Sequence, residues 1–177
     1  SQPHSMTTPL ETRSQRIRQF TEQSLAVALP THPRLMTRSE ALFAAKMVSE
    51  ELMELLSTVA LKDESPKSLL MQLIADEAKP PAYTNEGKSE ARLIEEQVDA
   101  LVDIDYYCGN AAAKVGLDMD QVFDVVHQAN MAKRFDDGQF HRNEEGKIVK
   151  PPGWQEGDVG AVVERWLKNG TWSSSTQ

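Results

Sequence analysis

The sequence predicts an all-α protein, a helical bundle of four to five main helices that is completed by oligomerisation. Of its 177 residues, 40% are apolar and only 6% are aromatic, so the chain can bury a core but is poor in side chains that favour strands. Apolar residues also recur at helical spacing through long charged segments. Hydroxyl, aspartate, glycine and proline residues stand where such helices should begin and end.

The first half of the chain predicts three helices. An amphipathic pattern over 14–28 indicates the first, and Pro30 ends it. Thr37-Arg38-Ser39-Glu40 is a capping box, a hydroxyl with a glutamate three residues later, and it predicts the start of a long helix over 38–61. Ser65-Pro66 begins a shorter helix over 65–78, which Pro80-Pro81 closes.

The second half predicts three more helices. Ser89 can cap a helix over 89–115, and Gly116 supplies the left-handed residue that often follows a helix end. Asp118 starts a helix over 118–134, which the turn Asp136-Asp137-Gly138 ends. A polar loop or small hairpin follows over 139–154, and Asp158 then caps a last helix over 159–169.

We expect these helices to form one domain over 12–170, because the length fits a single core. Residues 1–11 are expected to be a tail, the first five of which could be a cloning scar. The serine-rich end, 171–177, is expected to be frayed.

Charge and hydropathy limit the partners. Nineteen Lys and Arg residues against 27 Asp and Glu give a net charge of −8, which disfavours binding to nucleic acid polymers or anionic membranes. No apolar stretch approaches the roughly 20 residues of a membrane helix, so we expect a soluble, cytoplasmic protein. Cys108 is the only cysteine, and we expect a small buried side chain there rather than a thiol nucleophile.

Two acidic rows are the first candidates for chemistry. Glu50, Glu51 and Glu54 lie on one side of the helix over 38–61, and Glu96, Asp99 and Asp103 form a stripe on the helix over 89–115. Such rows are usually solvated helix faces, but antiparallel packing of the two helices could bring them together. The carboxylates would then repel one another unless hard cations neutralise them, and oxygen ligands favour Mg²⁺ or Mn²⁺.

A basic group follows the acidic rows. His127, Asn130 and Arg134 share a face of the helix over 118–134, with Lys133 at its border. The following loop adds Arg142, Lys147 and Lys150. Such a group can bind phosphate oxygens, although Lys133 and Arg134 also suit the dipole of a helix C-terminus.

The order of these residues carries a resemblance. Glu50-Glu51-x-x-Glu54, Asp99-x-x-x-Asp103, His127-x-x-Asn130-x-x-Lys133 and the run Gly146 to Pro152 follow one another. Over about Thr37 to Trp154 the chain resembles the all-α nucleoside triphosphate pyrophosphohydrolases, in their MazG-like, phosphoribosyl-ATP pyrophosphohydrolase-like branch. The resemblance implies a Mg²⁺-dependent hydrolase that cleaves between the α- and β-phosphates of a nucleotide, releasing a monophosphate and pyrophosphate.

The same resemblance implies residue roles and a homo-oligomer, a dimer or a tetramer. Its metal ligands would be Glu50, Glu51, Glu54, Asp99 and Asp103, with Glu50 or Glu51 as the base that takes the proton of the attacking water. Ala100 stands where the family usually has a glutamate, and Asp99 is the substitute. The substrate would be bound by Asn130, Lys133, Arg134, Lys147 and Lys150.

Two other readings stay open. Asp124-x-x-His127 on a helical bundle could belong to a di-iron or di-manganese oxidoreductase, although that arrangement usually needs Glu-x-x-His twice. Alternatively, the chain is a non-catalytic interaction module whose acidic faces keep it soluble. Trp154 or Tyr83 could stack on a base or simply pack, and the sequence does not identify the nucleotide.

Overall fold

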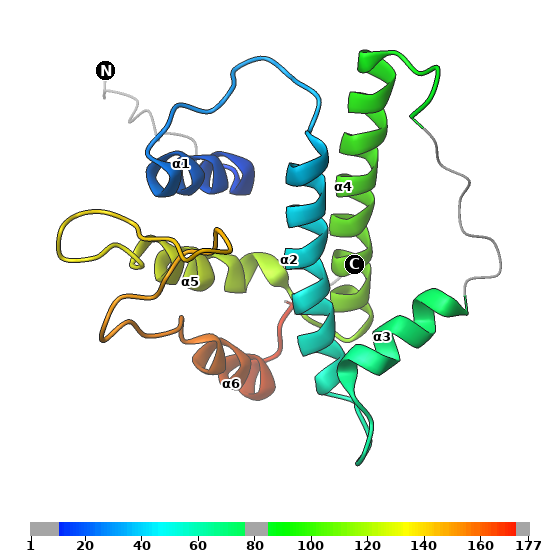
Figure 1. The fold of residues 1–177 in the computed structure, drawn as a ribbon. Helices are drawn as coiled ribbons and strands as arrows, with labels where there is room; N and C mark the ends of the chain where they lie inside the picture. The colour runs from blue at the N-terminus through cyan, green and yellow to red at the C-terminus, as the bar shows by residue number, and fades with distance from the viewer. Residues whose placement is uncertain (1–10, 77–84, 173–177) are drawn as a thin grey trace, which may run out of the picture. The chain divides into compact units, whose positions relative to one another are not determined.

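The computed structural model describes residues 11–76 and 85–172, and this part of the chain is helical (Figure 1). Its six helices are α1 (Arg13–Leu25), α2 (Arg38–Ser57), α3 (Pro66–Ala75), α4 (Glu90–Lys114), α5 (Met119–Met131) and α6 (Val159–Asn169). Within the same ranges, β structure is limited to an isolated antiparallel bridge between Arg142 and Ile148. The predicted all-α class is therefore confirmed.

The helices group into two compact units. The first unit comprises residues up to Thr31 and from Asp103 onwards, and so includes α1, the second half of α4, α5 and α6. The second unit runs from His32 to Val102 and contains α2, α3 and the first half of α4. The single domain over 12–170 stays a prediction.

Side-chain caps start the helices where the sequence predicts them. The capping box of α2 forms in full, with the Glu40 amide donating to the Thr37 hydroxyl and the Thr37 amide donating to the Glu40 carboxylate. The predicted caps of α3, α4, α5 and α6 also accept backbone amides; they are Ser65, Ser89, Asp118 and Asp158. A second capping box, formed by Thr12 and Gln15, starts α1 and was not predicted.

In the first unit, α5 packs against both α1 and α6 and lies between them in Figure 1. Trp166 of α6 is buried, and its indole N–H donates to the Gln121 side chain of α5 at 2.9 Å. Gly157 permits a close approach before α6, because a Cβ atom there would lie 2.6 Å from the Val125 carbonyl oxygen. On the other side, Arg16 of α1 forms an ion pair with Asp124. These contacts hold α5 in place.

The loop after α5 folds back as a small hairpin, one of the two alternatives that the sequence leaves open. The Asn143 amide donates to the Lys147 carbonyl, and the Val149 amide donates to the His141 carbonyl, at 2.9 and 2.7 Å. Gly146 turns the chain at a φ of 82°, which L side chains rarely adopt. The hairpin ends in a second turn, where the Trp154 amide donates to the Pro151 carbonyl.

In the second unit, α2 packs against α3, and Gln97 of α4 exchanges two hydrogen bonds with the Met36 backbone just before α2. Figure 1 shows α2 and the first half of α4 running in the same direction. The antiparallel packing that we considered as a way to bring the two acidic rows together is therefore wrong. Antiparallel neighbours follow from short connections, whereas α3 lies between α2 and α4 in the chain.

Helix ends are less well predicted than helix starts. Four helices stop a few residues early, namely α1, α2, α3 and α5. At the end of α2 the hydroxyl groups of Ser57 and Thr58 donate to carbonyls one turn back, so these side chains compete with further helix formation. Cys108 is exposed on α4, so the expectation of a buried thiol is wrong. A helical pattern alone does not show which face a neighbour covers.

Several predictions concern residues outside the described ranges: the tail up to residue 10, the Pro80-Pro81 end of the third helix, Tyr83, and the end from 173. In the described part, each helix is too short or too polar to cross a bilayer.

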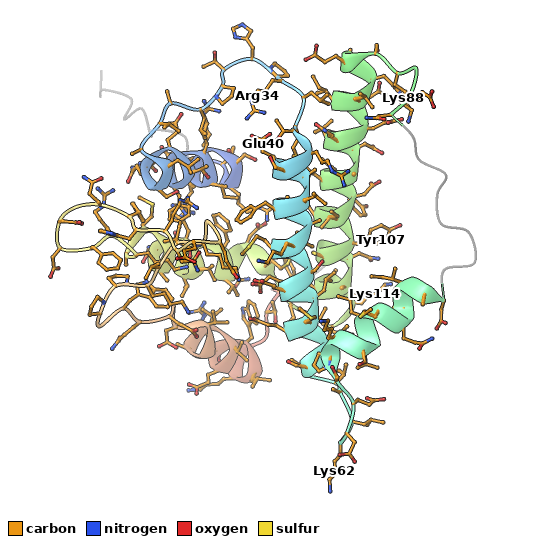
Figure 2. All side chains as sticks on the ribbon, viewed as in Figure 1. Arg34, Glu40, Lys62, Lys88, Tyr107 and Lys114 are labelled. Atoms are coloured by element: carbon orange, nitrogen blue, oxygen red, sulfur yellow. The ribbon has the colours of Figure 1, made fainter. Side chains whose placement is uncertain are left out.

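An ion pair reinforces the start of α2, where Figure 2 labels Arg34 and Glu40. The Arg34 guanidinium donates to both carboxylate oxygens of Glu40, at 2.9 and 2.6 Å. These hydrogen bonds, with that from the Thr37 amide, lower the pKa of Glu40 from its ordinary 4.5 to about 2. A lowered carboxyl pKa adds stability above pH 4.5, and this contribution is lost as the pH falls toward 2.

We therefore predict that Glu40→Gln flattens the acid limb of the stability curve. Between pH 5 and 3 the melting temperature of the wild type should fall more than that of the variant, because glutamine keeps an oxygen for the Thr37 amide but has no charge to lose. Circular dichroism melts across this range measure the difference. Glu144→Gln, at an exposed turn position, serves as the control. Equal slopes for wild type and Glu40→Gln would contradict the prediction.

Candidate active site

The glutamate row of α2 lies in the second unit, on the helix that the Thr37 capping box starts. Glu51 and Glu54 are exposed and stand one turn apart, while Glu50 is half-buried. Because residues three and four apart share a side of a helix, both Glu50 and Glu51 lie near Glu54 on the surface of α2. The predicted arrangement of these three carboxylates along one helix is thus present.

The acids of α4 differ in their surroundings. Asp99 and Asp103 are exposed one turn apart, Asp99 in the second unit and Asp103 in the first. Glu96 instead accepts two hydrogen bonds from the Lys88 ammonium, both of 2.9 Å, and forms an ion pair with Arg92. The Lys88 hydrogen bonds, more than any other contact, lower the pKa of Glu96. Two cations therefore neutralise Glu96, and the uncompensated charge of the stripe falls on Asp99 and Asp103.

Within 11–76 and 85–172, no three histidine, cysteine, aspartate or glutamate side chains come close enough to hold one metal ion. The metal ligands Glu50, Glu51, Glu54, Asp99 and Asp103 therefore stay a prediction, as does the assignment of the base to Glu50 or Glu51.

Two of the predicted phosphate-binding lysines come together in the first unit. Lys133, just after α5, places its ammonium 5.1 Å from the ring centre of Trp154. Lys150, at the end of the hairpin, places its ammonium 4.8 Å from the same centre. Burial lowers the pKa of Lys133, repulsion by Lys150 lowers it further, and Glu156 opposes both. The site is thus a pair of cations on one indole ring.

The other predicted substrate-binding residues have varied surroundings. Asn130 is half-buried in the last turn of α5, and its backbone carbonyl accepts the Lys133 amide. Lys147 is half-buried in the hairpin and bonds to Asn143 through its backbone. Arg134 donates to the Gly138 carbonyl and to the Gln23 side chain of α1, and its guanidinium lies 5.1 Å from the Phe140 ring centre. The guanidinium of Arg134 thus joins α1 to the loop after α5.

The residues of the di-iron alternative make packing contacts instead. One oxygen of Asp124 pairs with Arg16, and the other accepts from Gln128 at 3.0 Å. His127 is buried, and its ring stacks on Phe123 at 5.7 Å between centres. These contacts explain the Asp124-x-x-His127 spacing without a metal.

A pocket of about 460 Å³ opens elsewhere in the first unit, between α1, the end of α4 and the start of α5. Arg13 reaches across it to Asp105 and Asp120, at 3.4 Å each, and Tyr106 and Trp172 line its wall. Its lining, in the described part of the chain, contains none of the predicted catalytic, metal or substrate residues. The pocket is therefore separate from the predicted site.

Trp154 is the residue that the sequence did not assign. Its indole N–H donates to the Ala129 carbonyl at 2.7 Å, which fixes the ring against the last turn of α5. A tryptophan four residues after a lysine, with the turn Pro151-Pro152-Gly153 between them, is the signal that could have suggested this contact.

Comparison with known proteins agrees with the class that the fold and these residues define, the all-α nucleoside triphosphate pyrophosphohydrolases. The sequence model of the phosphoribosyl-ATP pyrophosphohydrolase family matches residues 17–130. The chain belongs to this family, as the resemblance predicted, and the match supports pyrophosphohydrolase activity on nucleotides in general.

A solved structure agrees with the family assignment. A protein from Exiguobacterium sp. 255-15, provisionally assigned as an NTP pyrophosphohydrolase, is 27% identical to this chain, with a TM-score of 0.69. The similarity covers 88% of this chain and 95% of that protein. A search of curated proteins found no match.

The contacts of Arg134 lead to a stability prediction. Arg134→Ala should lower the free energy of unfolding by about 1 kcal/mol, because it removes the hydrogen bonds to Gln23 and Gly138. Gln23→Ala should lose part of the same energy, with a coupling of about 0.5 kcal/mol in the double-mutant cycle. Urea unfolding measures all three variants, and Arg165→Ala on α6 is the control.

The same variants test the predicted substrate role of Arg134. If Arg134 acts only through α1 and the loop, Gln23→Ala should raise the nucleotide KM in the same direction as Arg134→Ala but by a smaller factor, because it removes only one of the Arg134 contacts. A KM increase confined to Arg134→Ala would show direct contact with substrate and contradict the purely structural account.

Proposed function

We propose that this chain is a Mg²⁺-dependent nucleotide pyrophosphohydrolase that cleaves the bond between the α- and β-phosphates, releasing a nucleoside monophosphate and pyrophosphate. Membership of the phosphoribosyl-ATP pyrophosphohydrolase family is the observation that carries the proposal. The similarity to the Exiguobacterium protein supports it. We expect the enzyme to act on free nucleotides in the cytoplasm, and Mn²⁺ could replace Mg²⁺.

The donor set fits a hard divalent cation in its chemistry. Glu50, Glu51 and Glu54 of α2 and Asp99 and Asp103 of α4 offer only carboxylate oxygens, and all except Glu50 are exposed. Mg²⁺ and Mn²⁺ prefer such oxygens over nitrogen or sulfur. When bound, the ion would neutralise the triphosphate and help to orient its α-phosphate.

The side chains of this chain would perform the remaining tasks. Glu50 or Glu51 would accept the proton of the water that attacks the α-phosphorus, while the bond from that phosphorus to the bridging oxygen breaks. Lys133 and Lys150, on one indole ring, would bind the phosphates and stabilise the charge of the departing pyrophosphate. Asn130 and Lys147 would complete the substrate contacts.

The test is a pyrophosphate-release assay over a panel of nucleotides with Mg²⁺ or Mn²⁺. We predict that at least one nucleotide is hydrolysed and that Glu51→Gln lowers kcat by about a hundredfold or more, because the variant has lost a carboxylate that binds the cation or takes the proton. Glu164→Gln, an exposed glutamate of α6, should leave kcat unchanged. Mg²⁺ should also raise the melting temperature of the wild type more than that of Glu51→Gln, because an ion that binds only the folded state stabilises it.

Two results would contradict the proposal. If no nucleotide of a broad panel releases pyrophosphate with either ion, the proposed catalytic function is wrong and a non-catalytic interaction module is favoured. If Glu51→Gln hydrolyses nucleotides as fast as the wild type, Glu51 is neither the base nor an essential metal ligand.

We also propose that the protein is a dimer or a tetramer. The second unit exposes large apolar side chains on α2, just after it and on α3: Leu55, Val59, Met71, Leu73 and Ile74. Exposed apolar side chains of this size are typical of an interaction site, and a symmetric interface between copies would cover them.

We predict a solution mass of about two or four times the chain mass of 19.8 kDa, measured by analytical ultracentrifugation. Leu73→Glu should shift the protein toward the monomer by placing a charge in the interface, whereas Lys67→Glu, also on α3, should not. A wild-type monomer at high protein concentration would contradict the proposal.

A further inference from the structure

Trp154 holds a fixed position between a helix and a hairpin. Its indole N–H donates to the Ala129 carbonyl at 2.7 Å, and its own amide closes the turn with Pro151. The Lys133 amide donates to Asn130, three residues back, instead of to the Ala129 carbonyl four residues back. The indole therefore satisfies a carbonyl at the end of α5 that the helix leaves open.

Two ammonium groups lie close to this one ring. Lys133 lies before the hairpin and Lys150 at its end, and their nitrogens lie 5.1 and 4.8 Å from the ring centre. A tryptophan ring attracts a cation through its quadrupole, so it can hold each ammonium in place. The two cations repel each other, however, and Glu156 is the acid whose charge opposes this repulsion at Lys133.

An anion that offers oxygens to both lysines would relieve the repulsion and keep both contacts with the ring. Phosphate groups suit such a site, because an ammonium is a compact charge with three donors that can turn toward different oxygens. A chain of two phosphates offers each ammonium a phosphate group of its own, whereas an isolated phosphate must share its oxygens between the two. We therefore expect the lysine pair to bind a pyrophosphate group more tightly than an isolated phosphate.

We propose that Trp154 is a positioning residue that holds Lys133 and Lys150 as a clamp for a pyrophosphate group and does not stack on the nucleotide base. This inference rests on the proposed function, in which pyrophosphate is the leaving group. The ring already meets two ammonium groups and donates its N–H to Ala129, so its polar and electrostatic partners are all within the protein.

The test is calorimetric binding of inorganic pyrophosphate and of inorganic phosphate, with EDTA present so that bound cations do not contribute. Trp154→Leu should lower the ratio of the two affinities by about tenfold, because the lysines separate without the ring. Trp154→Phe retains an aromatic face but loses the hydrogen bond to Ala129, so it should lower the ratio less than Trp154→Leu does. Trp172→Leu, which changes an exposed tryptophan of the same unit, should leave the ratio unchanged. A fold defect changes the active fraction but not this ratio.

A second pair of ligands separates positioning from base stacking. Binding of ATP and of inorganic triphosphate, again with EDTA, should weaken by the same factor in Trp154→Leu. A loss confined to ATP would show that the ring stacks on the base and would overturn the proposal. An unchanged ratio of pyrophosphate to phosphate affinity in Trp154→Leu would overturn it as well.

If Trp154→Leu does not fold, Lys150→Gln gives an independent result. The pKa of the Lys133 ammonium, measured by NMR of the lysine side chains, should rise in Lys150→Gln because the repulsion by Lys150 is removed. An unchanged pKa would mean that the two ammonium groups do not meet on the ring, and the proposal would fail.

These measurements need no turnover, so the two proposals can fail separately. Nucleotide hydrolysis with an unchanged affinity ratio in Trp154→Leu would refute the clamp alone. A lowered ratio without hydrolysis of any nucleotide would refute the enzymatic function and leave a protein that binds polyphosphate.

Discussion

The hydrogen bond from the Trp154 indole to the Ala129 carbonyl is the contact on which the basic site depends. It ties the end of the hairpin to the end of α5, and it thereby brings Lys150 and Lys133 to one ring. The contact can position the two lysines only if α5 is itself held in place, and the packing of α1 and α6 against α5 holds it. Helix packing in the first unit thus determines where the charges of Lys133 and Lys150 lie.

Arginine and lysine have different tasks in this unit. Arg134 and Arg142 each donate to a loop carbonyl and to a side chain of α1, so their planar groups join segments far apart in the chain. A guanidinium with several fixed donors suits such bridging, whereas an ammonium is a movable point charge. Lys133 and Lys150 hold their charges on a ring that competes weakly with an anion. The acids of α4 also differ in their surroundings. Lys88 and Arg92 neutralise Glu96, whereas Asp99 and Asp103 lie exposed.

Features that depend on contacts between residues close in the sequence were predicted, and features that depend on distant contacts were not. Helix starts were predicted because a cap is a local contact, as Thr37 with Glu40 shows, and the family followed from a local order of acids and bases. The direction of the first half of α4 relative to α2 and the exposure of Cys108 were missed, because both depend on which elements meet. The same reason left Trp154 unassigned: its partners are 25, 21 and 4 residues away, and no periodicity links them.

A clamp that binds phosphates has a consequence for substrate choice. Every nucleoside triphosphate carries the same phosphate chain, so two lysines on an indole ring cannot distinguish one base from another. If Trp154 is occupied by these lysines, recognition of the base must come from other side chains. In the proposed enzyme, the charged residues would then determine how tightly the phosphate chain binds and which of its bonds is cleaved. Less charged side chains elsewhere would determine which nucleotide is preferred. Relatives with the same lysines and tryptophan could therefore differ in substrate without any change in the chemistry of cleavage.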